Sequence, residues 1–244
     1  MRRDPDFNVN KDHRGGLTLF HCACYENHRS AVIPLLLAHP DIDVSVKSKY
    51  GETPFYWACG GRPSCVREML KDFRVKLNDP ANDGSTPLWS ATRFVLLDIM
   101  KWWIGSGREI DLGKPGDVDK TDAIEVAKNW GRTEMATLLQ RFKNDPAKTR
   151  HAVRLEIGWY DEAAAEIFAL VVFVSDGLLQ INETTTATPA ARFINIARRL
   201  PLELQMLLCH RVVGSSKEIN SGQDSEVAFK SLAKRLIWSS IFTK

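Results

Sequence analysis

Residues 51–59, Gly-Glu-Thr-Pro-Phe-Tyr-Trp-Ala-Cys, decide the fold because a near copy follows at residues 84–92, Gly-Ser-Thr-Pro-Leu-Trp-Ser-Ala-Thr. A looser copy, Thr-Leu-Phe-His-Cys-Ala, occupies residues 18–23, and a degenerate copy, Asp-Ala-Ile-Glu-Val-Ala, occupies residues 122–127. The Thr or Asp that opens each copy lies 35, 33 and 36 residues after the one before it. Self-similarity at a fixed period of this length indicates repeated units that stack on their neighbours.

A second pattern repeats with the same step. It alternates apolar and polar residues as Phe-Asn-Val-Asn, Ile-Asp-Val-Ser, Val-Lys-Leu-Asn and Ile-Asp-Leu-Gly, at residues 7–10, 42–45, 75–78 and 110–113. The steps are 35, 33 and 35 residues, so two separate patterns report one period.

Both patterns resemble the ankyrin repeat, whose units are about 33 residues long and whose signature is Thr-Pro-Leu-His-x-Ala. The resemblance covers residues 5–143 and implies an all-α solenoid of helix-turn-helix units with β-turn fingers. The expected units are residues 13–45, 48–78, 81–113 and 117–143, after the end of a partial repeat at residues 5–10. That partial repeat leads us to expect further upstream repeats in longer relatives.

Each signature letter has a structural role. Glycine suits the tight turn before a helix, threonine caps the helix, proline fits its first position, and alanine lets neighbouring helices approach closely. The residues expected in the structural positions of the signature are Thr18, His21, Ala23, Gly51, Thr53, Pro54, Ala58, Gly84, Thr86, Pro87, Ala91, Ala127 and Gly131.

The chain departs from the signature in two ways. The histidine position holds His21 in the first unit and then Tyr56, Trp89 and Glu125. In addition, Pro34 lies in the expected second helix of the first unit, where proline either bends a helix or shifts its start.

Composition limits the function classes. The chain has 244 residues, 44% of them hydrophobic, and 33 basic against 30 acidic residues give a net charge of +3. This small charge predicts neither a nucleic-acid nor a membrane partner. Five cysteines without framework spacing, and an N-terminus without an apolar signal core, predict an intracellular protein, cytoplasmic or nuclear. The most apolar run, residues 163–181, carries Glu166 and Asp176 and predicts buried structure rather than a membrane span.

One segment has the residue types of a metal site. His21, Cys24 and His28 would share one helical face, and zinc accepts such ligands. The repeat register accounts for the same residues by packing, so we expect no metal and no cofactor.

Residues 144–152 are expected to be a linker and residues 153–244 a helical C-terminal domain, with helices near 161–174, 189–200, 202–213 and 224–238. Acidic residues Asp161, Glu162 and Glu166 suit the start of the first of these helices. An enzyme that uses these carboxylates is the least favoured alternative, because no nucleophile elbow, phosphate-binding loop or paired-cysteine spacing is present.

The segment Leu-Pro-Leu-Glu-Leu at residues 200–204 resembles the opening of an F-box, and the resemblance extends to residue 238. It implies an alternative function, a ubiquitin-ligase substrate adaptor. A helical cap on the last repeat is the other interpretation of the C-terminal domain.

The favoured function is a non-enzymatic scaffold that binds an unidentified protein partner through its finger loops and concave helical face. By register with the family, the expected contact residues are Arg14, Tyr25, Glu26, Lys49, Tyr50, Glu52, Asn82, Asp83, Arg93, Phe94, Asn129 and Trp130. Exposed aromatic residues and arginine commonly dominate binding energy, so Tyr50, Arg93, Phe94 and Trp130 are the strongest candidates.

Overall fold

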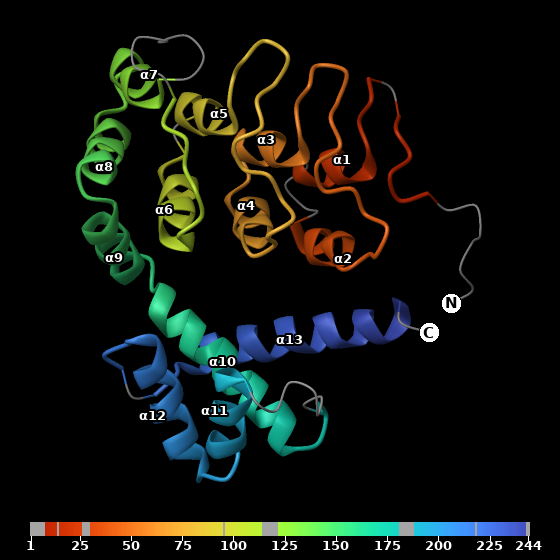
Figure 1. The fold of residues 1–244 in the computed structure, drawn as a ribbon, viewed down its shortest axis with the longest axis vertical. Coiled ribbons are helices and arrows are strands. Elements are labelled where there is room, and N and C mark those ends of the chain that lie inside the picture. Colours follow the sequence, from red (N-terminus) through yellow and green to blue (C-terminus); the bar gives the residue numbers. More distant parts are fainter. Residues whose placement is uncertain are drawn as a thin grey trace. The chain divides into compact units, whose positions relative to one another are not determined.

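The structure is a computed structural model that describes residues 8–13, 15–25, 30–94, 96–113, 122–180, 188–217 and 219–242. Across these residues the chain forms thirteen α-helices and one short 3-10 helix, without a β-strand. An isolated antiparallel bridge joins Asp12 and Thr18. The chain divides into two compact units, residues 1–153 and 154–244, and Figure 1 shows the helices of each.

The N-terminal unit consists of helix pairs. The pairs are α1 (Leu19–Tyr25) with α2 (Ile33–Leu37), α3 (Pro54–Cys59) with α4 (Pro63–Leu70), α5 (Pro87–Arg93) with α6 (Leu97–Ser106), and α7 (Ala123–Asn129) with α8 (Thr133–Asn144). The first helices α1, α3, α5 and α7 pack side by side in one row, and the second helices form another (Figure 1). This confirms the predicted all-α solenoid.

The first helices begin at residues that cap them. The side chains of Thr53 and Thr86 each accept a hydrogen bond of 3.2 Å, from the backbone N–H groups of Tyr56 and Trp89. Asp122 takes the same role in the fourth unit, where its carboxylate accepts from the Glu125 N–H at 3.0 Å. Because these bonds satisfy backbone donors left open at a helix start, they fix where each helix begins.

The core lies between the two rows of helices. The signature alanines Ala23, Ala58, Ala91 and Ala127 are buried, and the absence of longer side chains lets the first helices pack closely. Phe55 and Trp103, both fully buried, meet edge to face with ring centroids 5.1 Å apart. This pair joins a first helix of one unit to the second helix of the next.

Proline shifts the second helix of the first unit rather than bending it. Residues 30–32 form a 3-10 turn, and α2 starts at Ile33, so Pro34 lies in its first turn. A proline there lacks only an N–H that would have no helical partner. The result is a short helix of five residues.

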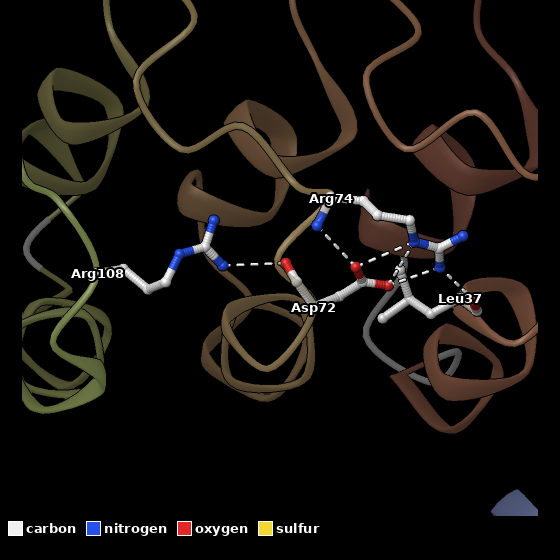
Figure 2. Close-up of polar contacts among 4 residues, drawn as sticks. All are labelled: Leu37, Asp72, Arg74 and Arg108. Carbon is white, nitrogen blue, oxygen red and sulfur yellow. Dashed lines mark hydrogen bonds and ion pairs between the residues drawn. The ribbon is translucent and has the colours of Figure 1, made fainter. Parts of the chain in front are cut away.

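Two arginines brace successive second helices (Figure 2). The Arg74 guanidinium donates to the Leu37 carbonyl and to the Asp72 carboxylate. Arg108 donates to the carbonyl groups of Leu70, Asp72 and Val75, at 3.4, 3.0 and 2.7 Å. The bonds to Leu37, Leu70, Val75 and the Asp72 carbonyl join neighbouring units, whereas the Arg74 bond to the Asp72 carboxylate lies within one unit.

Asparagines join neighbouring fingers. The Asn82 side chain donates to the Lys49 carbonyl at 3.0 Å, and its backbone N–H donates to the Tyr50 carbonyl at 2.8 Å. The second repeated pattern has a similar role, because Asn10 bonds to the backbone of Asp41 and Asp43. Register along the solenoid is therefore fixed by hydrogen bonds as well as by packing.

The C-terminal unit is helical, as predicted. Its helices are α10 (Trp159–Ser175), α11 (Pro189–Ala197), α12 (Leu202–Val213) and α13 (Gly222–Phe242), and the unit boundary falls within α9 (Pro146–Glu156). Residues 144–152, expected to be a linker, therefore end α8 and form most of α9. Helix α10 packs against the other three around Phe168, Val171, Ala197 and Cys209. None of the described helices is long and apolar enough to cross a membrane.

Candidate partner-binding surface

The tip of the second finger presents Lys49 and Tyr50 to solvent. A hydrogen bond of 2.9 Å from the Gly51 N–H to the Ser48 carbonyl closes the turn. The Ser48 hydroxyl accepts from the Tyr50 N–H at 3.2 Å, and Gly51 supplies the positive φ of 78° that the turn requires. Tyr50 is 59% exposed, and the Lys49 ammonium lies 4.8 Å from its ring centroid.

A first group of side chains, the Trp57 cluster, consists of Tyr25, Glu52, Trp57 and Arg62. Trp57 donates from its indole nitrogen to Glu52 at 2.9 Å and meets Tyr25 edge to face at 5.4 Å. The Arg62 guanidinium lies 5.9 Å from the Tyr25 ring and donates to the Tyr25 carbonyl at 2.7 Å. Since Ser48 also donates to Glu52, at 3.3 Å, this carboxylate joins the cluster to the finger.

A second group, the Arg93 cluster, consists of Trp89, Arg93, Phe94 and Trp130. The Arg93 guanidinium lies 5.3 Å from the Trp89 ring, 5.7 Å from Phe94 and 5.8 Å from Trp130. Phe94 and Trp130 are 52% and 53% exposed. One cation therefore orders three aromatic rings that come from two successive repeats.

The finger tip and the two clusters form one surface, the aromatic face. Gly60 follows α3, beyond Trp57, and a Cβ atom at Gly60 would lie 3.8 Å from the Phe94 ring. The backbone that follows Trp57 therefore lies beside Phe94, which makes the two clusters neighbours. Exposed aromatic side chains grouped in this way are typical of protein interaction sites.

The expected contact residues separate into three groups. Arg14 and Glu26 lie outside the described residues. Tyr25, Lys49, Tyr50, Glu52, Arg93, Phe94 and Trp130 belong to the aromatic face, and Asn129 is exposed beside Trp130. Asn82 and Asp83 are exposed but also structural, since Asn82 braces the preceding finger and Asp83 accepts from the Ser85 N–H and hydroxyl.

Sequence reasoning missed Trp57 and Arg62. Trp57 is half-buried and lies edge to face against the exposed Tyr25. Arg62 follows α3 in the loop between paired helices, where proteins of this kind commonly contact partners. Its position in that loop is the signal that could have found it.

The histidine–cysteine segment packs within the solenoid. The His21 ring accepts from the Thr18 N–H at 3.1 Å, and its other nitrogen donates to the Glu52 carbonyl at 3.1 Å. Burial lowers the pKa of His21, and the bond to the Glu52 carbonyl opposes that effect. The Cys24 thiol is buried 3.7 Å from the Met69 sulfur, and His28 lies outside the described residues. Among the residues that are described, no three His, Cys, Asp or Glu side chains gather as metal ligands would.

The C-terminal carboxylates hold a loop. Asp161 accepts from the Ser215 hydroxyl at 2.6 Å and pairs with the Lys217 ammonium at 2.7 Å. Burial alone would raise the pKa of Asp161, but the bonds from Lys217 and Ser215 outweigh it, so the net pKa is lowered. A general acid needs a raised pKa, so this group is suited to anchoring rather than to proton transfer.

The adjacent Cys209 and His210 are buried. Burial raises the pKa of the Cys209 thiol to about 11, so the thiol is not activated as a nucleophile at neutral pH. Neither ring nitrogen of His210 has a hydrogen-bond partner in the described part of the chain. The two residues therefore lack the geometry of a catalytic dyad.

Comparison with known proteins places the repeats in a family. The family described as ankyrin repeats (3 copies) matches residues 3–79 and 20–113. The N-terminal region thus consists of ankyrin repeats, and α7 and α8 continue the same stack beyond the matched residues.

Three curated relatives carry the name SMC5-SMC6 complex localization factor protein 1. The human protein is 29% identical over 196 residues, which cover 74% of this chain and 18% of the human protein. The cattle protein is 41% identical over 86 residues, which cover 34% of this chain and 8% of the cattle protein. The mouse protein is 38% identical over 65 residues, which cover 26% of this chain and 6% of the mouse protein. This chain spans less than a fifth of these relatives. Since 74% of the chain is more than the repeats occupy, the similarity to the human protein extends into the C-terminal region.

Proposed function

We propose that this chain, whose N-terminal region consists of ankyrin repeats, is a non-enzymatic scaffold that binds a protein partner through the aromatic face. The observation that carries the proposal is the exposure of four aromatic side chains on that face. Tyr25, Tyr50, Phe94 and Trp130 are each more than half exposed. They come from four successive repeats, so a partner that lies along the solenoid would cover all of them.

The expected energetics support a binding role. Full burial of one large apolar side chain stabilises a complex by about 1.5–3 kcal/mol before the entropic cost of association. Two or three such residues at the centre of an interface can account for most of the affinity of a typical complex. The contacts with Lys49, Arg62 and Arg93 limit the rotamers of these rings in advance, which reduces the ordering cost of binding.

The relatives support an adaptor that brings protein components together. Their name refers to localization of the SMC5-SMC6 complex, so a subunit of that complex is the first partner to test. The scaffold would act inside the cell, in the cytoplasm or the nucleus. The five free cysteines support a reducing compartment.

The test is capture of partners from native extract by the full chain, with bound proteins identified by mass spectrometry. One bait is unaltered, and the second carries Tyr50→Ala, Arg93→Ala, Phe94→Ala and Trp130→Ala. A matched control carries Leu178→Ala and Ile219→Ala, which remove exposed apolar side chains of the C-terminal unit. A partner bound by the unaltered and control baits, but not by the fourfold variant, supports the proposal. Equal capture by all three baits, with the fold intact by circular dichroism, contradicts it.

A ubiquitin-ligase adaptor is the second candidate. The observation in its favour is the exposure of Leu202 and Leu204, 54% and 47%, at the start of α12, where the sequence resembles an F-box. Exposed leucines at a helix start are suited to docking on an apolar groove. Leu204→Glu should abolish capture of ligase components, whereas Leu178→Glu should not. Absence of ligase components from the unaltered bait contradicts this second candidate.

A further inference from the structure

The exposed aromatic rings share an unusual feature, because each has a cation within 6 Å of its centroid. Arg62 lies against Tyr25, Lys49 against Tyr50, and Arg93 against both Phe94 and Trp130. None of these three cations contacts a carboxylate within the described parts of the chain. A ring face attracts a cation but offers no oxygen to its N–H donors.

The carboxylate of this face and two carboxylates of the neighbouring repeats already have partners. Glu52 accepts hydrogen bonds from Trp57 and Ser48, and Asp83 accepts from Ser85. Glu125, at the start of α7, pairs with Lys128. These acids therefore already have hydrogen-bond or ion-pair partners, whereas the three cations of the aromatic face lack an acidic partner among the described residues.

We propose that the aromatic face binds an acidic segment of a protein partner, a segment in which aspartate or glutamate alternates with an aromatic or large aliphatic residue. A carboxylate of this segment pairs with Arg93, and the neighbouring apolar side chain lies against Trp130 and Phe94. The proposal rests on the scaffold function and adds the chemistry of the partner to it.

Arg93 is the residue best placed for this role. It is exposed, and Trp89, Phe94 and Trp130 limit the orientations of its guanidinium. A guanidinium carries five donors in a planar fork that matches a carboxylate. A partner carboxylate would therefore gain two charge-assisted hydrogen bonds at a position that is partly shielded from water by the rings.

An aromatic face with cations also has features of a single-stranded nucleic-acid site, since bases stack on rings and phosphates pair with cations. The charge pattern favours protein. The carboxylate of Glu52, whose hydrogen-bond donors Trp57 and Ser48 are neutral, lies within this face and would repel the uninterrupted charge of a phosphate backbone. An acidic peptide, by contrast, can carry its negative charges at the positions that face the cations and uncharged residues elsewhere.

The test is selection of short displayed peptides on the full chain, followed by affinity measurement with synthetic versions of the selected peptides. Arg93→Gln, Arg93→Lys and the control Lys71→Gln are compared with the unaltered chain. Lys71 pairs with Glu68 at the end of α4, so Lys71→Gln removes the same charge from the second-helix side. A single-stranded oligothymidylate is the competing probe.

The proposal expects selected peptides with net negative charge and an aromatic or large aliphatic residue. Arg93→Gln should weaken their binding about 10- to 100-fold, the range of a charge-assisted hydrogen-bond pair. The affinity of Arg93→Lys for these peptides should lie between that of the unaltered chain and that of Arg93→Gln, because lysine keeps the charge but not the planar fork. Lys71→Gln should leave affinity unchanged, and added salt should weaken binding to the unaltered chain.

Several outcomes contradict the acidic-segment proposal. The selected peptides could be basic or neutral and still lose binding when Tyr50, Phe94 and Trp130 are replaced by alanine. That outcome overturns the acidic-segment proposal but supports the scaffold function. Peptides that bind independently of both Arg93 and these aromatic residues count against both proposals, as does a selection that yields no peptide. Tighter, Arg93-dependent binding of the oligothymidylate assigns the face to nucleic acid instead.

Discussion

Arg74 and Arg108 both follow the second helix of their own repeat, and each donates to the carbonyl group that ends the second helix of the preceding repeat. Arg74 bonds to Leu37, the last residue of α2 (Figure 2). Arg108 bonds to Leu70, the last residue of α4. The last carbonyl groups of a helix lack helical partners and carry the negative end of its dipole. Each arginine therefore caps a helix in the unit before its own, which couples the stability of neighbouring repeats.

Arg108→Ala should lower the free energy of unfolding of the repeats by about 2 kcal/mol, because three carbonyl groups lose a charged donor. Urea denaturation followed by circular dichroism measures the change. The control Lys71→Ala removes a partly exposed i,i+3 ion pair and should change stability by at most about 0.5 kcal/mol. Equal effects of the two variants would show that the carbonyl bonds contribute no more than a surface charge does.

Gly51→Ala should destabilise the protein more than Gly131→Ala does. Both glycines have positive φ, 78° and 67°. A Cβ atom at Gly51 would lie 2.2 Å from the Asn82 side-chain oxygen and 2.7 Å from the Asn82 backbone nitrogen, whereas a Cβ at Gly131 would meet nothing within 4 Å.

Gly131→Ala should therefore show the backbone cost alone, about 1–2 kcal/mol. Gly51→Ala should exceed that cost by at least about 1 kcal/mol, because the two neighbouring fingers must move apart. Thermal or urea unfolding of the two variants gives the comparison. Equal destabilisation by the two variants would mean that the fingers adjust to the new Cβ atom without a further loss of stability.

Mild acid should destabilise the N-terminal unit through His21. Its pKa is lowered in the folded protein, because burial disfavours the charged ring more than the Glu52 carbonyl favours it. The unfolded chain therefore binds a proton at a higher pH than the folded protein does. The stabilisation is complete above the ordinary pKa of 6.5 and is lost as the pH falls below it, by at most about 1.4 kcal/mol per pH unit.

Urea denaturation at about pH 7.5 and about pH 5.5 spans the range in which histidine titrates. The unaltered chain should lose stability between these values, and His21→Gln should lose less. His13→Gln, which removes an exposed histidine, should behave as the unaltered chain does. A pH dependence that persists unchanged in His21→Gln would assign the effect to another group.

Thiol reagents should distinguish Cys22 from the other four cysteines. Cys24, Cys59, Cys65 and Cys209 are buried, and burial raises the pKa of each thiol. Since the thiolate is the reactive form, these four should react slowly in the folded protein. Only Cys22, which is partly exposed, should react rapidly, and all five should react in denaturant. Rapid reaction of two or more thiols without denaturant would show that a unit opens readily.

The sequence predicted the elements whose signals lie within one repeat. Thr53 and Thr86 each bond to a backbone group three residues along the chain, so the capping geometry could be inferred from the signature. Helix α12 was likewise predicted at its observed bounds, between Pro201 and Gly214. By contrast, residues 144–152 were expected to be a linker, but most of them are helical and contact residues elsewhere in the chain. Arg150, for example, donates to the carbonyl group of Ile104, near the end of α6.

The sequence by itself determined that the first part of this protein is an all-α solenoid, because period, caps and small residues act locally and recur in each unit. Only the tertiary structure decided what the surface offers to a partner. Trp130 and Arg93 belong to different repeats, and Glu52 and Trp57 become partners only when α3 forms and the finger folds back on it. Whether an exposed side chain already has a partner depends on the folded geometry, within one repeat for Glu52 and between two repeats for Arg93.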